Sequence, residues 1–154
     1  AGLLFLVLAT NVGCDQVSKK MVRQSVDFHE QINIIPDFLT LTKVENTGAF
    51  LSLGDGLPPT PKLILLVGLP SLMLMFAFLY LFTNRHLSII KAVSMACIVG
   101  GGVGNIYDRV IHGSVTDFLH LDFRVFETGV FNLADVSSMT GAAIILLDLL
   151  FNRE

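Results

Sequence analysis

Two aspartates, Asp117 and Asp135, have the residue type and the setting that proton-transfer chemistry requires. Each lies beside or within an apolar run and close to amide or hydroxyl side chains. Two carboxylates in one pocket of low dielectric constant cannot both ionise easily, so they share a proton. The charged carboxylate can then activate water, while the protonated one binds a carbonyl oxygen and later protonates a leaving amine. Spacing alone favours the plainer interpretation, a pair of helix-cap or loop aspartates.

Other reactive groups in the chain are poorer candidates for catalysis. Cys97 has no histidine near it in the sequence that could activate its thiol. No plausible Gly-x-Ser-x-Gly segment presents a serine nucleophile. The histidines lack the paired helical spacing that a zinc site uses. We therefore expect neither a metal ion nor an organic cofactor.

The composition restricts the class of protein that could hold these aspartates. The chain has 154 residues, of which 53% are apolar and 15% are charged, whereas a soluble domain carries about 25% charged residues. The mean hydropathy is +0.70. A chain of this size has too little interior to bury so much apolar surface in water. The net charge of −3 and the absence of a basic stripe exclude a nucleic-acid partner, and a small polytopic membrane protein remains.

Four apolar stretches are long enough to cross a bilayer, which needs about 20 mostly apolar residues per helix. They lie at about 2–22, 63–82, 88–107 and 130–151. The sequence therefore predicts an all-α polytopic membrane protein with four transmembrane helices in a single domain, 1–154. The segments at about 23–62 and 108–129 are expected on the extracytoplasmic side. Alternating side chains in Phe38–Val44 predict a strand within the first of these segments.

Four spans would place both chain ends on the same side of the membrane. Basic residues on that side indicate that it is cytoplasmic: Arg85, Lys91 and Arg153. Three basic residues after the first span weaken this signal: Lys19, Lys20 and Arg23. Because the chain begins at Ala1 rather than at Met, we expect a preceding segment that carries further charges.

Ionisable groups inside membrane spans are costly, so each one is a candidate for function. Asp135 and Asp148 lie roughly 20 Å apart along the last span, near opposite membrane faces. At the cytoplasmic face, Asp148 and Lys91 are expected to form a structural pair or to extend toward water. Gly100 and Gly104 form a small-xxx-small pattern that lets helices approach closely. The polar residues expected together at the other face are Asp15, Asn105, Asp108, Arg109, Asp117, Asn132 and Asp135.

Five short motifs occur in order along the chain: Asp15–Lys19 (DQVSK), Glu45–Phe50 (ENTGAF), Gly101–Arg109 (GGVGNIYDR), Val115–Phe118 (VTDF) and Phe131–Asp135 (FNLAD). Each motif alone is weak. Together, in this order and spacing, they resemble the bacterial lipoprotein signal peptidases, signal peptidase II, over essentially the whole chain. An additional Gly100 and a short N-terminus depart from the family pattern, and neither involves the two aspartates.

The resemblance implies an intramembrane aspartyl endopeptidase of the bacterial inner membrane, with its active site near the periplasmic face. It would remove the signal peptide from diacylglyceryl-modified prolipoproteins by cutting just before the lipidated cysteine. The family's catalytic dyad corresponds to Asp117 and Asp135, which overturns the plainer interpretation of these residues. The supporting residues that the resemblance implies are Asp15, Lys19, Asn46, Gly48, Asn105, Arg109 and Asn132.

Roles for these supporting residues follow from their chemistry and from the resemblance. Asn105 and Asn132 are expected to hold the carboxylates by hydrogen bonds. Arg109 is expected to brace a loop or the substrate backbone, because an always-charged guanidinium cannot act as the acid. Asp15 and Lys19 form an i, i+4 pair on one helix face.

The resemblance also implies a small periplasmic β-sheet lying on the membrane and a short loop helix or lid after the third span. The expected partners are prolipoprotein substrates, membrane lipids and globomycin-type inhibitors, and the protein is expected to act as a monomer. The alternative is a non-enzymatic four-span transporter or assembly subunit, whose polar cluster would line a path. Such a path opens to both sides, yet the span at 63–82 carries only Ser71 and Tyr80 as polar residues.

Overall fold

The computed structural model describes residues 2–49 and 54–151, so Phe50 and Arg153, both named above, lie outside the described residues. The elements in chain order are α1 (Gly2–Ser25), β1 (Gln31–Ile35), β2 (Leu39–Asn46), α2 (Pro59–Leu63), η2 (Ile64–Gly68), α3 (Leu69–Thr83), α4 (Ile89–His112), β3 (Val115–Leu121) and α5 (Leu133–Phe151). The segments α2, η2 and α3 follow one another without a break, and η2 is π-helical.

Among the residues that the structure describes, three helical segments are long and apolar enough to cross a membrane: Pro59–Thr83, Ile89–His112 and Leu133–Phe151. These segments match the second, third and fourth predicted spans, so three apolar helices are confirmed. The first predicted span is helical as α1, but α1 is not among the three, and its buried residues include Asp15 and Lys19. The crossing by α1, and with it the count of four spans, stays a prediction.

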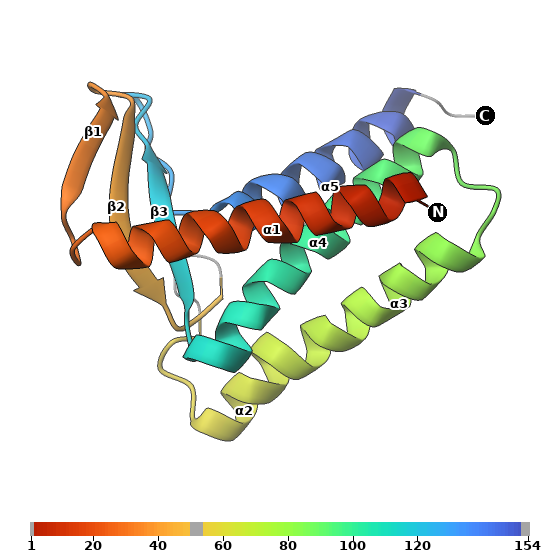
Figure 1. Ribbon diagram of the computed structural model, residues 1–154, viewed down its shortest axis with the longest axis horizontal. Coiled ribbons are helices and arrows are strands. Elements are labelled where there is room, and N and C mark those ends of the chain that lie inside the picture. The colour runs from red at the N-terminus through yellow and green to blue at the C-terminus, as the bar shows by residue number, and fades with distance from the viewer. Residues whose placement is uncertain (1, 50–53, 152–154) are drawn as a thin grey trace.

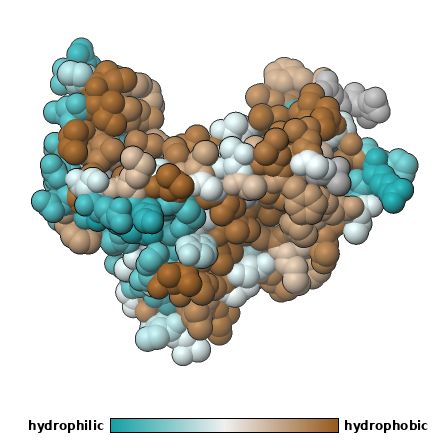
Figure 2. All heavy atoms as spheres, viewed as in Figure 1, coloured by the Kyte–Doolittle hydropathy of each residue, from teal (hydrophilic) through white to brown (hydrophobic). Residues whose placement is uncertain are grey.

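The helix α4 is the centre of the helical part, because α1, α3 and α5 each pack against it (Figure 1). The sheet lies across one end of the helices. The start of α1, the end of α5 and the α3–α4 connection lie at the opposite end (Figure 1). Figure 2 shows mainly hydrophobic side chains over the helices and hydrophilic ones gathered toward the two ends. This distribution is typical of helices surrounded by lipid.

Glycines on α4 let the neighbouring helices approach closely. A Cβ added at Gly100 would lie 2.9 Å from a side-chain atom of α1, and one at Gly104 would lie 2.7 Å from a carboxylate oxygen of Asp15. A Cβ at Gly101 would collide with the carbonyl oxygen of Ala134 in α5. The predicted packing role of Gly100 and Gly104 is therefore confirmed, and Gly101 extends close packing to α5.

Replacing Gly101 by Ala is expected to destabilise the protein by about 1–3 kcal/mol or more, because the Ala134 carbonyl oxygen is backbone and cannot move aside. The measurement is thermal unfolding in detergent. The matched control is Gly13→Ala in α1, where an added Cβ meets nothing within 4 Å. Because alanine favours a helix over glycine by up to about 1 kcal/mol, the control should be neutral or stabilising. Equal unfolding temperatures for the two variants would contradict this packing.

The strand predicted at Phe38–Val44 is confirmed as most of β2, and the sheet is antiparallel with strand order β1-β2-β3. Of the loop helix or lid predicted after the third span, the helix is wrong, and the lid stays a prediction. Residues 113–132 contain no helix, and β3 forms there instead. The backbone of β3 pairs with β2. Its buried side chain Phe118 packs against Val22 of α1 and against Val26.

The third predicted span continues beyond residue 107, because α4 runs to His112. It ends at Gly113, whose φ of +77° is the left-handed conformation that glycine adopts readily. The Gly113 N–H donates to the Arg109 carbonyl at 3.2 Å. The additional turn places Asp108 and Arg109 within α4, beside the sheet.

The far end of the helices holds a second pair of ionisable residues. Lys91 Nζ of α4 lies 3.1 Å from Asp148 Oδ2 of α5. The predicted structural pair is therefore confirmed. The lysine side chain is 42% exposed, so this contact lies at the edge of the helical part rather than within it.

Candidate active site

Asp117 lies in the middle of β3 and is only 4% exposed. Both of its carboxylate oxygens accept a hydrogen bond from an asparagine amide. Asn132 Nδ2 donates to Oδ1 at 2.6 Å, and Asn46 Nδ2 donates to Oδ2 at 3.0 Å. Each oxygen keeps a second lone pair, so the carboxyl group can still hold a proton or contact a water molecule.

Asp135 lies in the first turn of α5 and forms a reciprocal cap with Asn132. The Asn132 side-chain oxygen accepts from the Asp135 N–H at 3.0 Å, and Asp135 Oδ2 accepts from the Asn132 N–H at 3.1 Å. This is the capping-box arrangement, which satisfies otherwise unpaired N–H groups at a helix start. Asp135 Oδ1 accepts from Asn105 Nδ2 at 2.8 Å. Asp135 therefore does cap the helix. It also contacts Asn132, the residue whose side-chain amide donates to Asp117.

Asn132 and Asn105 join the two aspartates. The fully buried Asn132 uses one Nδ2 group to donate both to Asp117 and to Asn105 Oδ1, the latter at 3.1 Å. Asn105 then donates to Asp135. The prediction that these two asparagines contact the carboxylates is confirmed, and both aspartates lie within one connected hydrogen-bond network.

A buried lysine fixes the orientation of the Asn105 amide. Lys19 Nζ donates to Asn105 Oδ1 at 2.9 Å and lies 2.8 Å from Asp15 Oδ2 and 2.9 Å from Asp108 Oδ2. Lys19, Asp15 and Asp108 are all fully buried. Because the ammonium group offers only donors, it holds the Asn105 oxygen toward itself and turns the amide nitrogen toward Asp135.

Asp15 and Arg109 connect this network to its surroundings. Asp15 pairs with Lys19 as predicted, and its Oδ1 accepts from the N–H of Ala134 at the start of α5 at 3.0 Å. Arg109 Nη2 donates to the Gly48 carbonyl at 2.8 Å. This contact agrees with the first of the two roles expected of Arg109, bracing a loop, and all nine predicted site residues fall in one region.

Burial raises the pKa of Asp117 from its ordinary value of 3.8 to about 6. The amide of Asn46 opposes this effect by stabilising the charged form, whereas the nearby charge of Asp135 adds to it. The amide of Asn132 and the ammonium of Lys19 also favour the charged form, with smaller effect. Asp117 can therefore accept and release a proton close to neutral pH.

The raised pKa predicts a pH-dependent stability that Asp117→Asn removes. Between about pH 4 and pH 6 the folded protein holds a proton on Asp117 that the unfolded chain has released. The unfolding free energy of the wild type should therefore fall as the pH rises through this range, by about 3 kcal/mol relative to the variant. The measurement is the thermal unfolding of both proteins in detergent from about pH 4 to about pH 7.

Asp37→Asn is the control for this comparison, because the Asp37 side chain is 79% exposed and its removal leaves the buried site unchanged. Its unfolding temperature should follow that of the wild type at every pH. Parallel curves for the wild type and Asp117→Asn would contradict the raised pKa.

Two further residues contact the site: Asp108, predicted at this end of the helices without a role, and Arg23, which was not predicted to belong to the site. Arg23 Nη2 lies 3.0 Å from Asp108 Oδ1. Helical spacing could have found both residues. Arg23 follows Lys19 by one i, i+4 step on the face of Asp15, and Asp108 follows Asn105 by an i, i+3 step.

Within residues 2–49 and 54–151, no group of three or more His, Cys, Asp or Glu side chains could hold a metal ion. The Cys97 sulfur accepts from the side-chain amide of Asn11 at 3.9 Å.

The fold and the site together define a helical membrane protein with a buried aspartate, Asp117, and a partly buried one, Asp135, at one end of its helices. A family model described as signal peptidase (SPase) II matches residues 7–151. The lipoprotein signal peptidase of Pasteurella multocida (strain Pm70) is 36% identical over 158 residues, covering 100% of this chain and 93% of the relative. That of Enterococcus faecalis is 34% identical and covers 97% of this chain and 89% of the relative. The chain belongs to the signal peptidase II family.

Two solved structures share the fold, and both are described as bacterial membrane enzyme structures determined by the in meso method. One, at 2.3 Å resolution, matches with a TM-score of 0.86 and 24% identity, and it covers 100% of this chain and 93% of its own. The other, at 1.9 Å resolution, matches with a TM-score of 0.88 and 25% identity, and it covers 99% and 96%. The arrangement of the helices and the small sheet is therefore that of known bacterial membrane enzymes.

Proposed function

We propose that this protein is an aspartic endopeptidase that removes the signal peptide from diacylglyceryl-modified prolipoproteins, with Asp117 and Asp135 as its catalytic pair. Membership of the signal peptidase II family supports the reaction class. The observation that carries the assignment of residues is the bridge through Asn132, whose side chain contacts Asp117 at 2.6 Å and whose backbone and side chain cap Asp135.

The reaction follows from two carboxyl groups that hold one proton between them. The ionised carboxylate takes a proton from a water molecule, which attacks the carbonyl carbon of the peptide bond before the lipidated cysteine. The protonated carboxyl group donates a hydrogen bond to the carbonyl oxygen as negative charge develops there. It then gives its proton to the departing amine, and the C–N bond breaks. No metal ion and no organic cofactor takes part.

The surrounding residues hold the reacting groups in place. Asn105 and Asn132 keep each carboxyl group in one orientation, so that little rearrangement is needed during the reaction. Arg109 fixes the loop at Gly48, and that loop borders the site because the Gly48 N–H donates to Asn46 Oδ1 at 3.0 Å. Substrate is thereby kept beside Asp117, and Arg109 contributes position rather than a proton.

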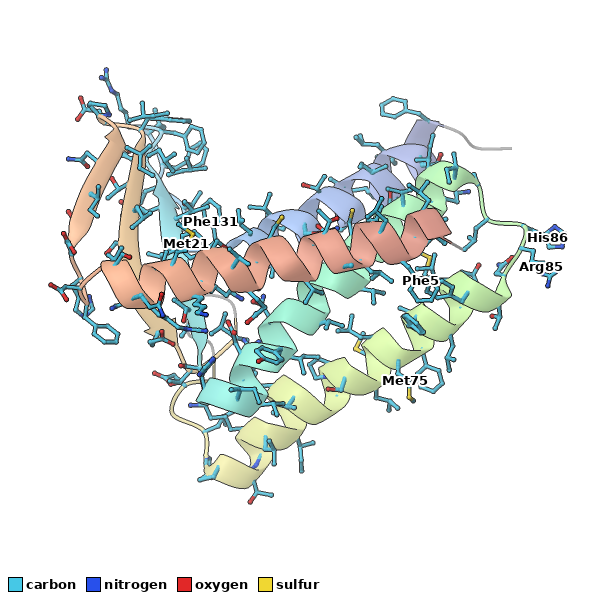
Figure 3. All side chains as sticks on the ribbon, in the orientation of Figure 1. Phe5, Met21, Met75, Arg85, His86 and Phe131 are labelled. Carbon is cyan, nitrogen blue, oxygen red and sulfur yellow. The ribbon has the colours of Figure 1, made fainter. Side chains whose placement is uncertain are left out.

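The proposed placement has four transmembrane helices in the bacterial inner membrane, with both chain ends in the cytoplasm. Arg85 and His86 lie at the α3–α4 connection, at the end of the helices away from the sheet (Figure 3). Basic residues at that end favour the cytoplasmic side, which leaves the sheet and the two aspartates at the periplasmic surface. There a single domain acting as a monomer would meet prolipoproteins, lipids and globomycin-type inhibitors.

A transporter remains the alternative function, and the distribution of polar residues disfavours it. Within residues 2–49 and 54–151, the buried carboxylates Asp15, Asp108 and Asp117 gather near the sheet. The far end holds the Lys91–Asp148 pair between α4 and α5. The apolar segment Pro59–Thr83 lies between the ends, and its residues 63–82 include only Ser71 and Tyr80 as polar residues, so it offers no polar path through the membrane.

The test is cleavage of a synthetic prolipoprotein by the purified protein in detergent, followed by a gel shift and by mass determination of the product. A diacylglyceryl-modified precursor should be cut just before the modified cysteine, and globomycin should block the cut. The unmodified precursor is the matched control and should be cut far more slowly. Equal cleavage of both precursors would remove the lipid requirement, and cleavage of neither would overturn the proposed function.

A further inference from the structure

Behind Asp117, on the opposite side of β3, four polar side chains form a cluster that the proposed reaction does not use. This rear cluster consists of Arg23, Glu45, Ser114 and Thr116. Arg23 Nε donates to Thr116 Oγ1 at 2.7 Å, and that hydroxyl donates to Glu45 Oε1 at 2.6 Å. The Ser114 hydroxyl donates to the other Glu45 oxygen. Thr116 is fully buried, so its hydroxyl depends on these two partners.

A bulge in β2 decides which of two neighbouring residues faces Asp117. The register between β2 and β3 shifts by one residue between Leu41 and Val44. Because side chains alternate along a strand, this shift exchanges the two faces of β2. As a result Asn46 lies on the face of Asp117 and donates to it, whereas Glu45 lies on the face of the rear cluster.

The rear cluster is also connected to the second aspartate. Arg23 bonds Thr116 and pairs with Asp108 at 3.0 Å, and Asp108 pairs with Lys19. The two carboxyl groups are therefore joined twice, in front through Asn132 and behind through a longer path. The residues of the rear path, in order, are Thr116, Arg23, Asp108, Lys19, Asn105 and Asp135.

We propose that the rear cluster positions Asp117 against Asp135 for the cleavage step, with Thr116 and Glu45 as positioning residues. The proposal rests on the proposed function. Thr116 is the residue next to Asp117, so a shift of its side chain moves the same stretch of β3 backbone that carries the carboxyl group. A displacement of about 1 Å can cost about 100-fold in rate. Substrate contacts are unaffected, because the rear cluster lies on the other face of the strand.

Pairs of substitutions at Thr116 and Glu45 test the proposal. Thr116→Val keeps the shape but removes the hydroxyl, and Thr116→Ser keeps the hydroxyl. Glu45→Leu removes both acceptors, whereas Glu45→Gln can still accept from Thr116 and donate to Ser114. We expect kcat for the lipid-modified precursor to fall by about 10- to 100-fold in the Val and Leu variants, with KM changed by less than about threefold. The Ser and Gln variants should stay within about threefold of the wild type.

Thr40→Val is the matched control, because the Thr40 hydroxyl bonds Asn33 on the exposed part of the same sheet. It should leave kcat unchanged. A wild-type kcat in Thr116→Val or Glu45→Leu, a loss confined to KM, or a failure of the Ser and Gln variants to restore kcat would overturn the proposal. If Thr116→Val does not fold, the comparison of kcat between Glu45→Leu and Glu45→Gln tests the proposal on its own. Inactive wild-type protein would instead reject the proposed function.

Discussion

Asp117→Asn and Asp135→Asn are each expected to lower kcat for precursor cleavage by at least about 10³-fold, because an amide can neither take up nor donate the shared proton. Both variants should remain folded, since asparagine keeps the size of the side chain. In Asp117→Asn the new side-chain NH₂ group faces another N–H donor, either that of Asn46 or that of Asn132. This unfavourable contact lowers stability, but at neutral pH the variant also no longer buries a charged carboxylate, which offsets the loss.

A variant that combines both substitutions shows whether the two aspartates act as one catalytic pair or contribute to the rate independently. Residues that act as a unit give losses that are far from additive, so the combination of Asp117→Asn and Asp135→Asn should lose little more activity than either single variant. The measurement is the single-turnover rate on the diacylglyceryl-modified precursor. Asp37→Asn, at a 79% exposed side chain, is the control and should be as active as the wild type. Wild-type rates in either single variant would reject the dyad.

Lys19→Met is expected to destabilise the folded protein by about 3–5 kcal/mol, because it leaves buried carboxylates without their counter-charge. Lys19 Nζ lies within 3 Å of oxygens on Asp15, Asp108 and Asn105. Methionine fills the same space but offers no donor. The measurement is thermal unfolding in detergent at neutral pH, together with the yield of folded protein.

Lys91→Met is the matched control for Lys19→Met, since Lys91 also forms an ion pair between membrane helices but is 42% exposed. A partly exposed pair contributes about 1 kcal/mol or less. Adding Asp15→Asn to Lys19→Met should recover part of the stability, because one of the unpaired carboxylates is then neutral. Similar unfolding temperatures for the Lys19 and Lys91 variants would show that the buried ammonium is not needed.

Much of this architecture was predictable because the relevant signals are local. Apolar stretches of spanning length predicted three helices that the structure contains, and alternation at Phe38–Val44 predicted most of β2. The interval from Asn132 to Asp135 is itself a capping pattern, so a local signal marked one half of the candidate pair. Helical spacing likewise predicted the Asp15–Lys19 pair.

The remaining features depend on contacts between distant segments. The loop helix expected after α4 is a strand because residues 115–121 find a partner in β2, which periodicity in one short segment does not reveal. The rear cluster draws on α1, β2 and β3, and the bulge that assigns Glu45 to it exists only in the paired sheet. Local sequence therefore indicates which side chains are present, while strand pairing decides which of them meet.

The close pairing of Asp15 and Lys19 has a consequence for how this chain enters the membrane. The other partners of Lys19 come much later in the chain, since Asn105 is 86 residues away. While the polypeptide is being synthesised, α1 emerges from the ribosome well before α4. An ion pair within α1 gives each of the two charges a partner in its own helix, which lowers the cost of burying either charge alone. The buried charges Asp15 and Lys19 thus begin as a pair within one helix, and they gain their remaining partners when α4 arrives.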